Sequence, residues 1–234
     1  MDIDKRIDFA VRQTQILRAP RKNLYTFGTT NIYYYLVTKP AYSDLIGDDT
    51  ETVVREGRVI TEKPKIVTPY YLSRFEGFSE EARRYFEGLA REHGPGFQGL
   101  LYTYKNEPRE MNIVSDNMIS VVEKLNKRID AQNDPLSAII KGEDDLWDVS
   151  LMKFLYEVTR TSVPYNLRQL ERRGLLDVDG KGTPEDTRKK IEDLFDSVSS
   201  GKLAAGELKD ELDRWGLFEE YEDRFFSLFG NNPG

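Results

Sequence analysis

The stretch Ile32-Tyr33-Tyr34-Tyr35-Leu36-Val37-Thr38 decides the fold, because each of its residues is β-branched, aromatic or leucine. Such side chains favour strands, since they pack well on a pleated surface. Side chains alternate between the two faces of a strand, so Tyr34 and Leu36 would lie on one face and Tyr35 and Val37 on the other. Both faces would be apolar. The stretch therefore predicts a central strand that other elements cover on both sides.

The residues around this strand predict antiparallel partners for it. Leu24–Phe27 is also rich in aromatic residues, and a short polar loop separates it from the central strand, which predicts a hairpin. A second hairpin is predicted from residues 51–55 and 58–62, which flank Glu56-Gly57, because glycine can take a positive φ in a tight turn. Short strands without regular intervening helices favour an antiparallel sheet. The other elements predicted in this half are helices over residues 4–17 and 80–92 and short strands over residues 65–68 and 100–104.

From about residue 112 onward the apolar residues follow helical spacing. The first stripe runs from Val114 to Ile129, and Asp134-Pro135 ends it. The predicted fold class is therefore α+β, with an N-terminal helix and a small antiparallel sheet followed by an all-helical C-terminal half. We expect an α+β domain over residues 1–111 and a helical domain over residues 112–230. Further helices are predicted over residues 136–141, 151–158, 164–173, 184–198, 204–214 and 217–229.

The composition excludes several kinds of chemistry. The 234 residues include no cysteine and one histidine, which removes thiolate metal sites, cysteine nucleophiles and multi-histidine metal centres. We predict no catalytic residue, metal or cofactor, and an enzyme with carboxylate and tyrosine chemistry ranks third among the functions considered. The net charge of −7 argues against a general coat for nucleic acid. Neither a signal peptide nor a membrane-spanning stretch is recognisable, so we expect a cytoplasmic protein of bacterial type without a membrane partner.

Residues 151–176 carry the most specific local pattern in the chain. Two segments of helical spacing follow each other, and the second contains Leu167, Leu170 and Gly174-Leu175-Leu176. This spacing resembles the second and recognition helices of the winged helix-turn-helix family, in which such a helix leads into a strand. The resemblance implies a pair of helices joined by a turn, with the second helix placed against nucleic acid.

The same resemblance implies a set of outward-facing side chains that can reach base edges or phosphates. Between residues 151 and 174 five basic side chains face only two acidic ones, which is consistent with phosphate contact. Nucleic-acid binding is the second-ranked function. The alternative for this segment is a packed helical hairpin with a solvated outer face. The implied contact residues are Arg160, Tyr165, Asn166, Arg168, Gln169 and Arg172.

The final helix carries the leading functional hypothesis. Residues 217–229 combine many charges with an apolar stripe, which is typical of an amphipathic helix that docks into a groove. The groove could belong to the chain's own helical core, to a second copy or to another protein. We expect a non-catalytic interaction or regulatory protein that acts through its helical half. The predicted interaction residues are Leu217, Phe218, Tyr221, Phe225, Phe226 and Phe229.

Overall fold

The computed structural model describes residues 3–43, 50–67, 92, 99–180 and 183–230. The predicted helix over residues 80–92 lies outside the described residues, apart from Glu92. The chain divides into two compact units, each made of two separate segments. The first unit contains Met1–Pro64 and Tyr102–Asn166, and the second contains Lys65–Leu101 and Leu167–Gly234.

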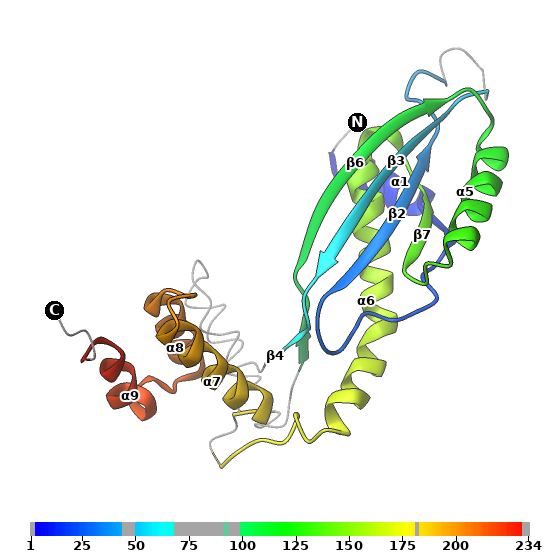
Figure 1. Ribbon diagram of the computed structural model, residues 1–234. Coiled ribbons are helices and arrows are strands. Elements are labelled where there is room, and N and C mark those ends of the chain that lie inside the picture. Colours follow the sequence, from blue (N-terminus) through cyan, green and yellow to red (C-terminus); the bar gives the residue numbers. More distant parts are fainter. Residues whose placement is uncertain (1–2, 44–49, 68–91, 93–98, 181–182, 231–234) are drawn as a thin grey trace. The chain divides into compact units, whose positions relative to one another are not determined.

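A five-stranded mixed sheet forms the centre of the first unit (Figure 1), with strand order β1-β7-β2-β3-β6. The neighbours β2, β3 and β6 are antiparallel. Strand β7 is parallel to β2 and antiparallel to β1. The bounds are β1 (Gln15–Arg18), β2 (Thr30–Thr38), β3 (Thr52–Thr61), β6 (Tyr104–Val114) and β7 (Ser137–Lys141).

Helices cover both faces of this sheet. On one face Tyr35 and Val37 of β2 pack with Val121, Leu125 and Ile129 of α5 (Met118–Gln132). On the other face Tyr34 and Leu36 of β2 pack against α6 (Trp147–Glu171). Figure 1 shows α6 running along one side of the sheet and α5 lying on the other. The prediction that the tyrosine-rich stretch forms a central strand, covered on both sides, is confirmed. Helix α1 (Ile3–Gln13) precedes β1, and a short 3-10 helix, Asp144–Leu146, precedes α6.

The α+β fold class is confirmed, but the sheet is mixed and not purely antiparallel. The sheet is mixed because β7 is parallel to β2. Residues 136–141, which contain β7, were predicted to form a short helix. In the structure Ala138 and Ile140 are buried on the α6 side, and Ile139 is buried on the α5 side. A segment this short and apolar is compatible with a helix or a doubly buried strand, and only its pairing with β2 and β1 decides between them.

Gly57 does not form the predicted hairpin turn. It lies in the middle of the continuous strand β3, directly opposite Tyr34 of β2. The aromatic ring of Tyr34 occupies the space that a side chain at Gly57 would need. The glycine is therefore required by a close approach across the sheet. The predicted strand Leu24–Phe27 is also not a strand: the Leu24 backbone N–H donates to Ser162 Oγ of α6 at 3.0 Å.

The division into units differs from the single boundary expected at residue 111. Strand β6 runs through that position and pairs with β3 along its whole length. Helix α5 and β7 then return the chain to β2, so residues on both sides of the expected boundary belong to one unit. A sequence pattern that changes along the chain marks the change of element type and not the limit of a core.

In its described residues the second unit contains a two-stranded sheet, the last turn of α6 and the helices α7, α8 and α9. Strands β4 and β5 are antiparallel, and the core contains Ile191 and Phe195 of α7 and Leu208 and Leu212 of α8. The three C-terminal helices are confirmed close to their predicted bounds. These elements are β4 (Lys65–Val67), β5 (Gly99–Leu101), α7 (Glu185–Ser199), α8 (Ala205–Trp215) and α9 (Phe218–Gly230).

A partly buried ion pair joins two helices of this unit. Lys190 Nζ of α7 donates to Glu211 Oε1 of α8 at 2.5 Å. Burial lowers the pKa of Lys190, although the neighbouring carboxylate of Glu211 favours the charged amine.

Among the described residues, no helix is both long and apolar enough to cross a membrane.

Candidate functional site

The predicted helix-turn-helix segment is one continuous helix in the structure. Residues 159–163, expected to form the turn, lie within α6. The inward side of α6 is uninterrupted: Leu151, Phe154, Leu155 and Val158 pack on the sheet, and Ser162 continues the same buried stripe. The buried stripe keeps its helical spacing across residues 159–163, so the segment remains one helix, although Pro164 lies inside it. The two-helix geometry implied by the resemblance is therefore corrected.

Asn166 is fully buried and does not face solvent. It accepts a hydrogen bond from Thr26 Oγ1 at 3.0 Å and donates to the Tyr102 hydroxyl at 2.8 Å. Burial raises the pKa of Tyr102 to about 12, so this hydroxyl stays protonated at neutral pH. Asn166 thus holds the segment before β2 and the residues between β5 and β6 against α6, and it cannot contact a base.

The other implied nucleic-acid contacts lie at or near the surface. Arg160 is exposed and forms an ion pair with Glu157 at 2.6 Å, while Arg168 and Arg172 are exposed and Gln169 is half-buried. Tyr165 is also exposed. Nucleic-acid binding by these side chains stays a prediction.

One of the basic residues counted in this segment is turned inward. Lys153 Nζ donates to the backbone carbonyls of Val11 and Thr14, at 2.8 and 3.0 Å. It therefore satisfies carbonyl groups at the end of α1, as cations near a helix C-terminus commonly do. The outward positive charge of α6 is smaller than the sequence suggested.

The six predicted interaction residues divide into two groups. Leu217 and Phe225 are buried in the core of the second unit, and Phe218 and Tyr221 pack partly against it. The simplest expectation, that the stripe docks on the chain's own helices, holds for these four residues. Phe226 and Phe229 are different, because 56% and 58% of their surfaces are exposed. The ring of Phe225 lies beneath both, at centroid distances of 5.7 and 5.5 Å.

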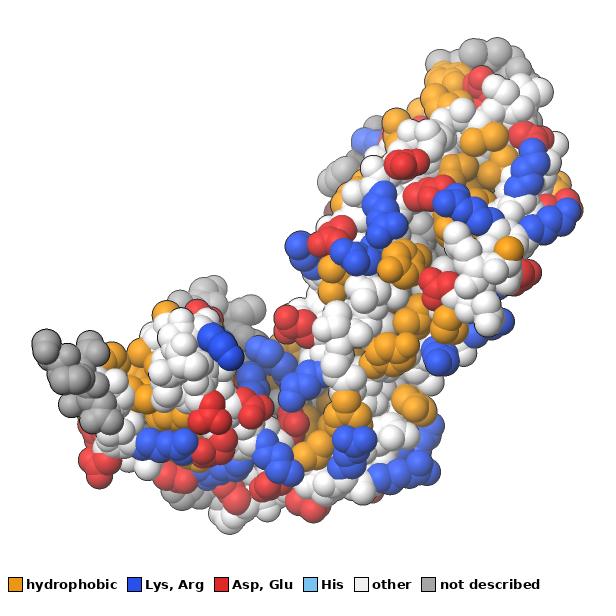
Figure 2. All heavy atoms as spheres, in the orientation of Figure 1, with side chains coloured by type: hydrophobic (Ala, Val, Ile, Leu, Met, Phe, Trp, Pro, Cys, Tyr) orange, Lys and Arg blue, Asp and Glu red, His pale blue; other side chains and the backbone are white. Residues whose placement is uncertain are grey.

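Three carboxylates share the exposed side of α9 with these two rings. Glu219, Glu222 and Asp223 are exposed and are spaced three, four or seven residues from Phe226 or Phe229, which places them on one helix face. We call these five residues the acidic-aromatic face. Figure 2 shows acidic side chains gathered around the end of the chain where α9 lies. Within the described part of the chain, no ion pair involves the three carboxylates.

Two arginines close to α9 already form ion pairs with carboxylates outside the acidic-aromatic face. Arg224 binds Glu192 of α7 at 2.7 Å and lies 4.2 Å from the ring centre of Phe195. Arg188 of α7 binds Glu220 at 2.6 Å. These contacts belong to the side of α9 that packs on α7, so they leave the acidic-aromatic face with a local negative charge.

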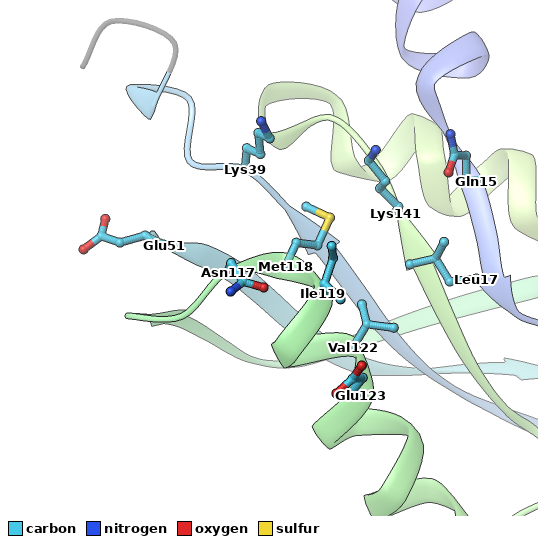
Figure 3. Close-up of a pocket in the computed structure, with 10 residues that line it drawn as sticks. All are labelled: Gln15, Leu17, Lys39, Glu51, Asn117, Met118, Ile119, Val122, Glu123 and Lys141. Atoms are coloured by element: carbon cyan, nitrogen blue, oxygen red, sulfur yellow. The ribbon is translucent and has the colours of Figure 1, made fainter. Parts of the chain in front are cut away.

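A second candidate site, which the sequence did not indicate, lies at the carboxyl ends of β2 and β7. A cavity of about 500 Å³ has a largely apolar wall surface, although the carboxylates Glu51 and Glu123 also line it. An adjoining polar cavity of about 430 Å³ shares Lys39, Met118 and Lys141 with it. Figure 3 shows both lysines beside Met118, with Leu17 of β1 and Ile119 and Val122 of α5 in the same cavity. Lys141 is the last residue of β7. The site could not be predicted from the sequence, because residues 136–141 were predicted to form a helix.

Two of the three acidic residues that line the polar cavity, Asp144 and Asp145, have cationic partners. Asp144 accepts from Arg55 at 2.6 Å and from the Thr38 hydroxyl at 2.7 Å, so it fixes the loop after β7. Asp145 lies 3.8 Å from Arg6. Among the residues that the structure describes, no cluster of three or more histidine, aspartate or glutamate side chains could hold a metal ion.

Comparison of the chain with protein-family models, curated proteins and solved structures found no match. Its function is therefore inferred from the geometry of these sites alone.

Proposed function

We propose that this chain is a non-catalytic interaction protein that binds a partner protein through the acidic-aromatic face of α9. The exposure of Phe226 and Phe229 beside three carboxylates carries the proposal. Large aromatic side chains that remain exposed next to one another are common at interaction sites, because burying them against a partner releases much free energy. We also propose that it acts in the cytosol, where a chain without cysteine is ordinary.

The partner's chemistry follows from the charges around the two rings. Glu219, Glu222 and Asp223 would meet a surface with a basic rim, and the two rings would enter an apolar groove inside that rim. A second copy of the chain fits poorly, because like charges would face each other across a two-fold interface. The proposal therefore commits to a different protein with an apolar groove and a lysine- or arginine-rich border.

The β6 edge of the large sheet is protected against the addition of another strand. Strand β6 is an edge strand, but Pro108 lacks an N–H and charged residues surround it. Proline and charge on an edge are typical devices against the addition of another strand.

Fluorescence anisotropy with a labelled peptide, carrying leucine on one helical face and lysine on the other, tests the proposal. We expect the full chain to bind it with roughly micromolar affinity, weakening as salt screens the charges. The double variant Phe226→Ser/Phe229→Ser should weaken binding at least about tenfold. The variant Glu222→Gln/Asp223→Asn should weaken binding less and reduce its salt dependence.

A matched control uses two exposed apolar residues of α6. Met152 and Tyr156 are 65% and 64% exposed, so Met152→Ser/Tyr156→Ser removes similar surface from the first unit. This control should bind the peptide like the wild type. Equal loss in both double variants, or none in the α9 variant, contradicts the proposal. Sedimentation at low salt should show a monomer.

A further inference from the structure

We propose that the paired cavities at the carboxyl ends of β2 and β7 bind a single-chain amphiphile with an anionic head, such as an aliphatic carboxylate. The head would lie between Lys39 and Lys141, and the chain would lie along Leu17, Ile119 and Val122. This site belongs to the first unit and is independent of the face proposed on α9.

The strand register builds the anionic end of the site. Lys141 is paired with Gln15 of β1 on one side and with Val37 of β2 on the other. Val37 packs towards α5, so Lys141, its partner in β7, points to the side where α5 begins. Lys39 lies one residue beyond the end of β2 and lines both cavities together with Lys141. Ligands commonly bind outside the carboxyl ends of neighbouring parallel strands.

Lys39 and Lys141 are the cations that line both cavities, and the carboxylates Glu51 and Glu123 lie on the wall of the apolar cavity. Within the described residues the Lys141 amine forms no hydrogen bond or ion pair, whereas Asp144 and Asp145 have cationic partners. Helix α5 begins in the cavity wall at Asn117 and Met118, and it has no acidic residue in its first turn. The helix N-terminus adds partial positive charge to that of the lysines.

An unpartnered hydroxyl supplies a second observation. Ser43 lines the polar cavity, is 5% exposed, and its Oγ has no hydrogen-bond partner; no other buried side-chain polar atom in the described part lacks one. Buried hydroxyl groups are normally paired, and an unpaired one loses free energy. A carboxylate held by the neighbouring lysines would accept a hydrogen bond from Ser43.

The apolar cavity is suited to a hydrocarbon chain. Leu17 is the extra residue of a β-bulge, since Ile16 pairs with Ile140 and Arg18 with Ile139. The bulge leaves Leu17 without a partner in β7, and the side chain lines the cavity. Ile119 is 75% exposed and lines the same cavity, so its side chain is accessible to a hydrocarbon chain. The volume of about 500 Å³ lies within the range of small-molecule sites.

Isothermal titration of the full chain with sodium decanoate tests the assignment. We expect decanoate to bind and decanol and decyltrimethylammonium to bind at least about tenfold more weakly, because neither alternative carries the anionic head. Shorter carboxylates should lose about fourfold in affinity per methylene removed. Vesicles of anionic phospholipid should leave the protein in solution, which separates a free amphiphile from a membrane surface.

Variants assign the two ends of the ligand. Lys141→Met should weaken decanoate at least about tenfold and leave decanol unchanged, and Ser43→Ala should have a smaller effect of the same kind. Ile119→Ser should weaken decanoate and decanol alike, because it removes apolar surface only. Lys127→Met, which removes a charge from an exposed position of α5, is the matched control and should bind decanoate normally. Absence of decanoate binding, equal binding of decanol, equal loss in the Lys127 variant, or binding to vesicles alone would overturn the proposal.

Discussion

Gly57 lies opposite Tyr34 where β3 pairs with β2. A Cβ atom at Gly57 would overlap the Tyr34 hydroxyl and lie 2.5 Å from Cζ and 2.8 Å from Cε1 of the ring. The ring cannot move away easily, because Tyr34 is fully buried and its hydroxyl donates to Asn106 Oδ1 at 3.1 Å. We expect Gly57→Ala to lower the free energy of unfolding by about 1–3 kcal/mol, as overpacking of a core does. Urea denaturation measures this change.

Gly206 provides the control for this substitution. It lies in α8, where nothing is within 4 Å of an added Cβ. Gly206→Ala should therefore raise the free energy of unfolding, by less than about 1 kcal/mol, because alanine is the better helix former. If the Gly57→Ala variant were as stable as the wild type, this result would contradict the close contact between Tyr34 and Gly57.

At the scale of the elements, the sequence predicted types well where a pattern is long and one-sided. The stripes of α5 and the three C-terminal helices, and the doubly apolar strand β2, are confirmed. The failures involve segments whose partners are distant in sequence. β7 is decided by its pairing with β2, more than 100 residues away, and α6 by a buried stripe that the sheet defines. Local propensity cannot supply either partner.

The candidate sites show the same contrast between local patterns and contacts with residues that are distant in sequence. The exposed rings of Phe226 and Phe229 lie within a set of residues that the sequence singled out, because one helix brings them together. The two lysines of the paired cavities, Lys39 after β2 and Lys141 at the end of β7, come together only in the fold. Gly57, with Glu56 before it, matched a turn pattern that the tertiary contact with Tyr34 overrides.

Pro164 tests whether α6 is continuous in solution. A proline inside a helix removes one backbone hydrogen bond, and its ring crowds the carbonyl group four residues earlier. Pro164 is exposed, so Pro164→Ala should raise the free energy of unfolding by about 1–3 kcal/mol without loss of packing. In a helix-turn-helix pair the same proline would lie in the first turn of the second helix, where proline is favourable, and the substitution would not stabilise the chain. Thermal and urea unfolding give the sign of the effect.

Pro184 is the control with the opposite expectation. It immediately precedes α7 with a φ of −63°, which proline adopts without strain. Pro184 is also buried, so Pro184→Ala should lower the free energy of unfolding by about 1 kcal/mol or more, through lost packing and a more flexible unfolded chain. Stabilisation by both substitutions would indicate a general effect of proline and not a helix that passes through residue 164.

At the scale of the whole molecule, the distribution of charge favours protein binding over nucleic-acid binding, the two functions that the sequence left open. The chain carries a net charge of −7, and the carboxylates of the acidic-aromatic face are unneutralised within the described part. Two of the basic residues counted on α6 already have partners, since Lys153 binds carbonyl groups at the end of α1 and Arg160 pairs with Glu157. Nucleic acid would have to bind the remaining cations of α6 against repulsion from the rest of the chain.

We therefore expect the full chain to show no binding to random duplex DNA or single-stranded RNA at physiological salt, as measured by fluorescence anisotropy. Any binding at low salt should be general attraction to scattered cations. Arg168→Glu, at an implied contact, and Lys127→Glu, on the outer side of α5, should then weaken it equally, since both change the charge by the same amount. Salt-sensitive binding that Arg168→Glu abolishes and Lys127→Glu leaves intact would contradict this expectation. It would assign α6 to nucleic acid despite its continuous helix, because only a localised surface makes one arginine matter more than another cation.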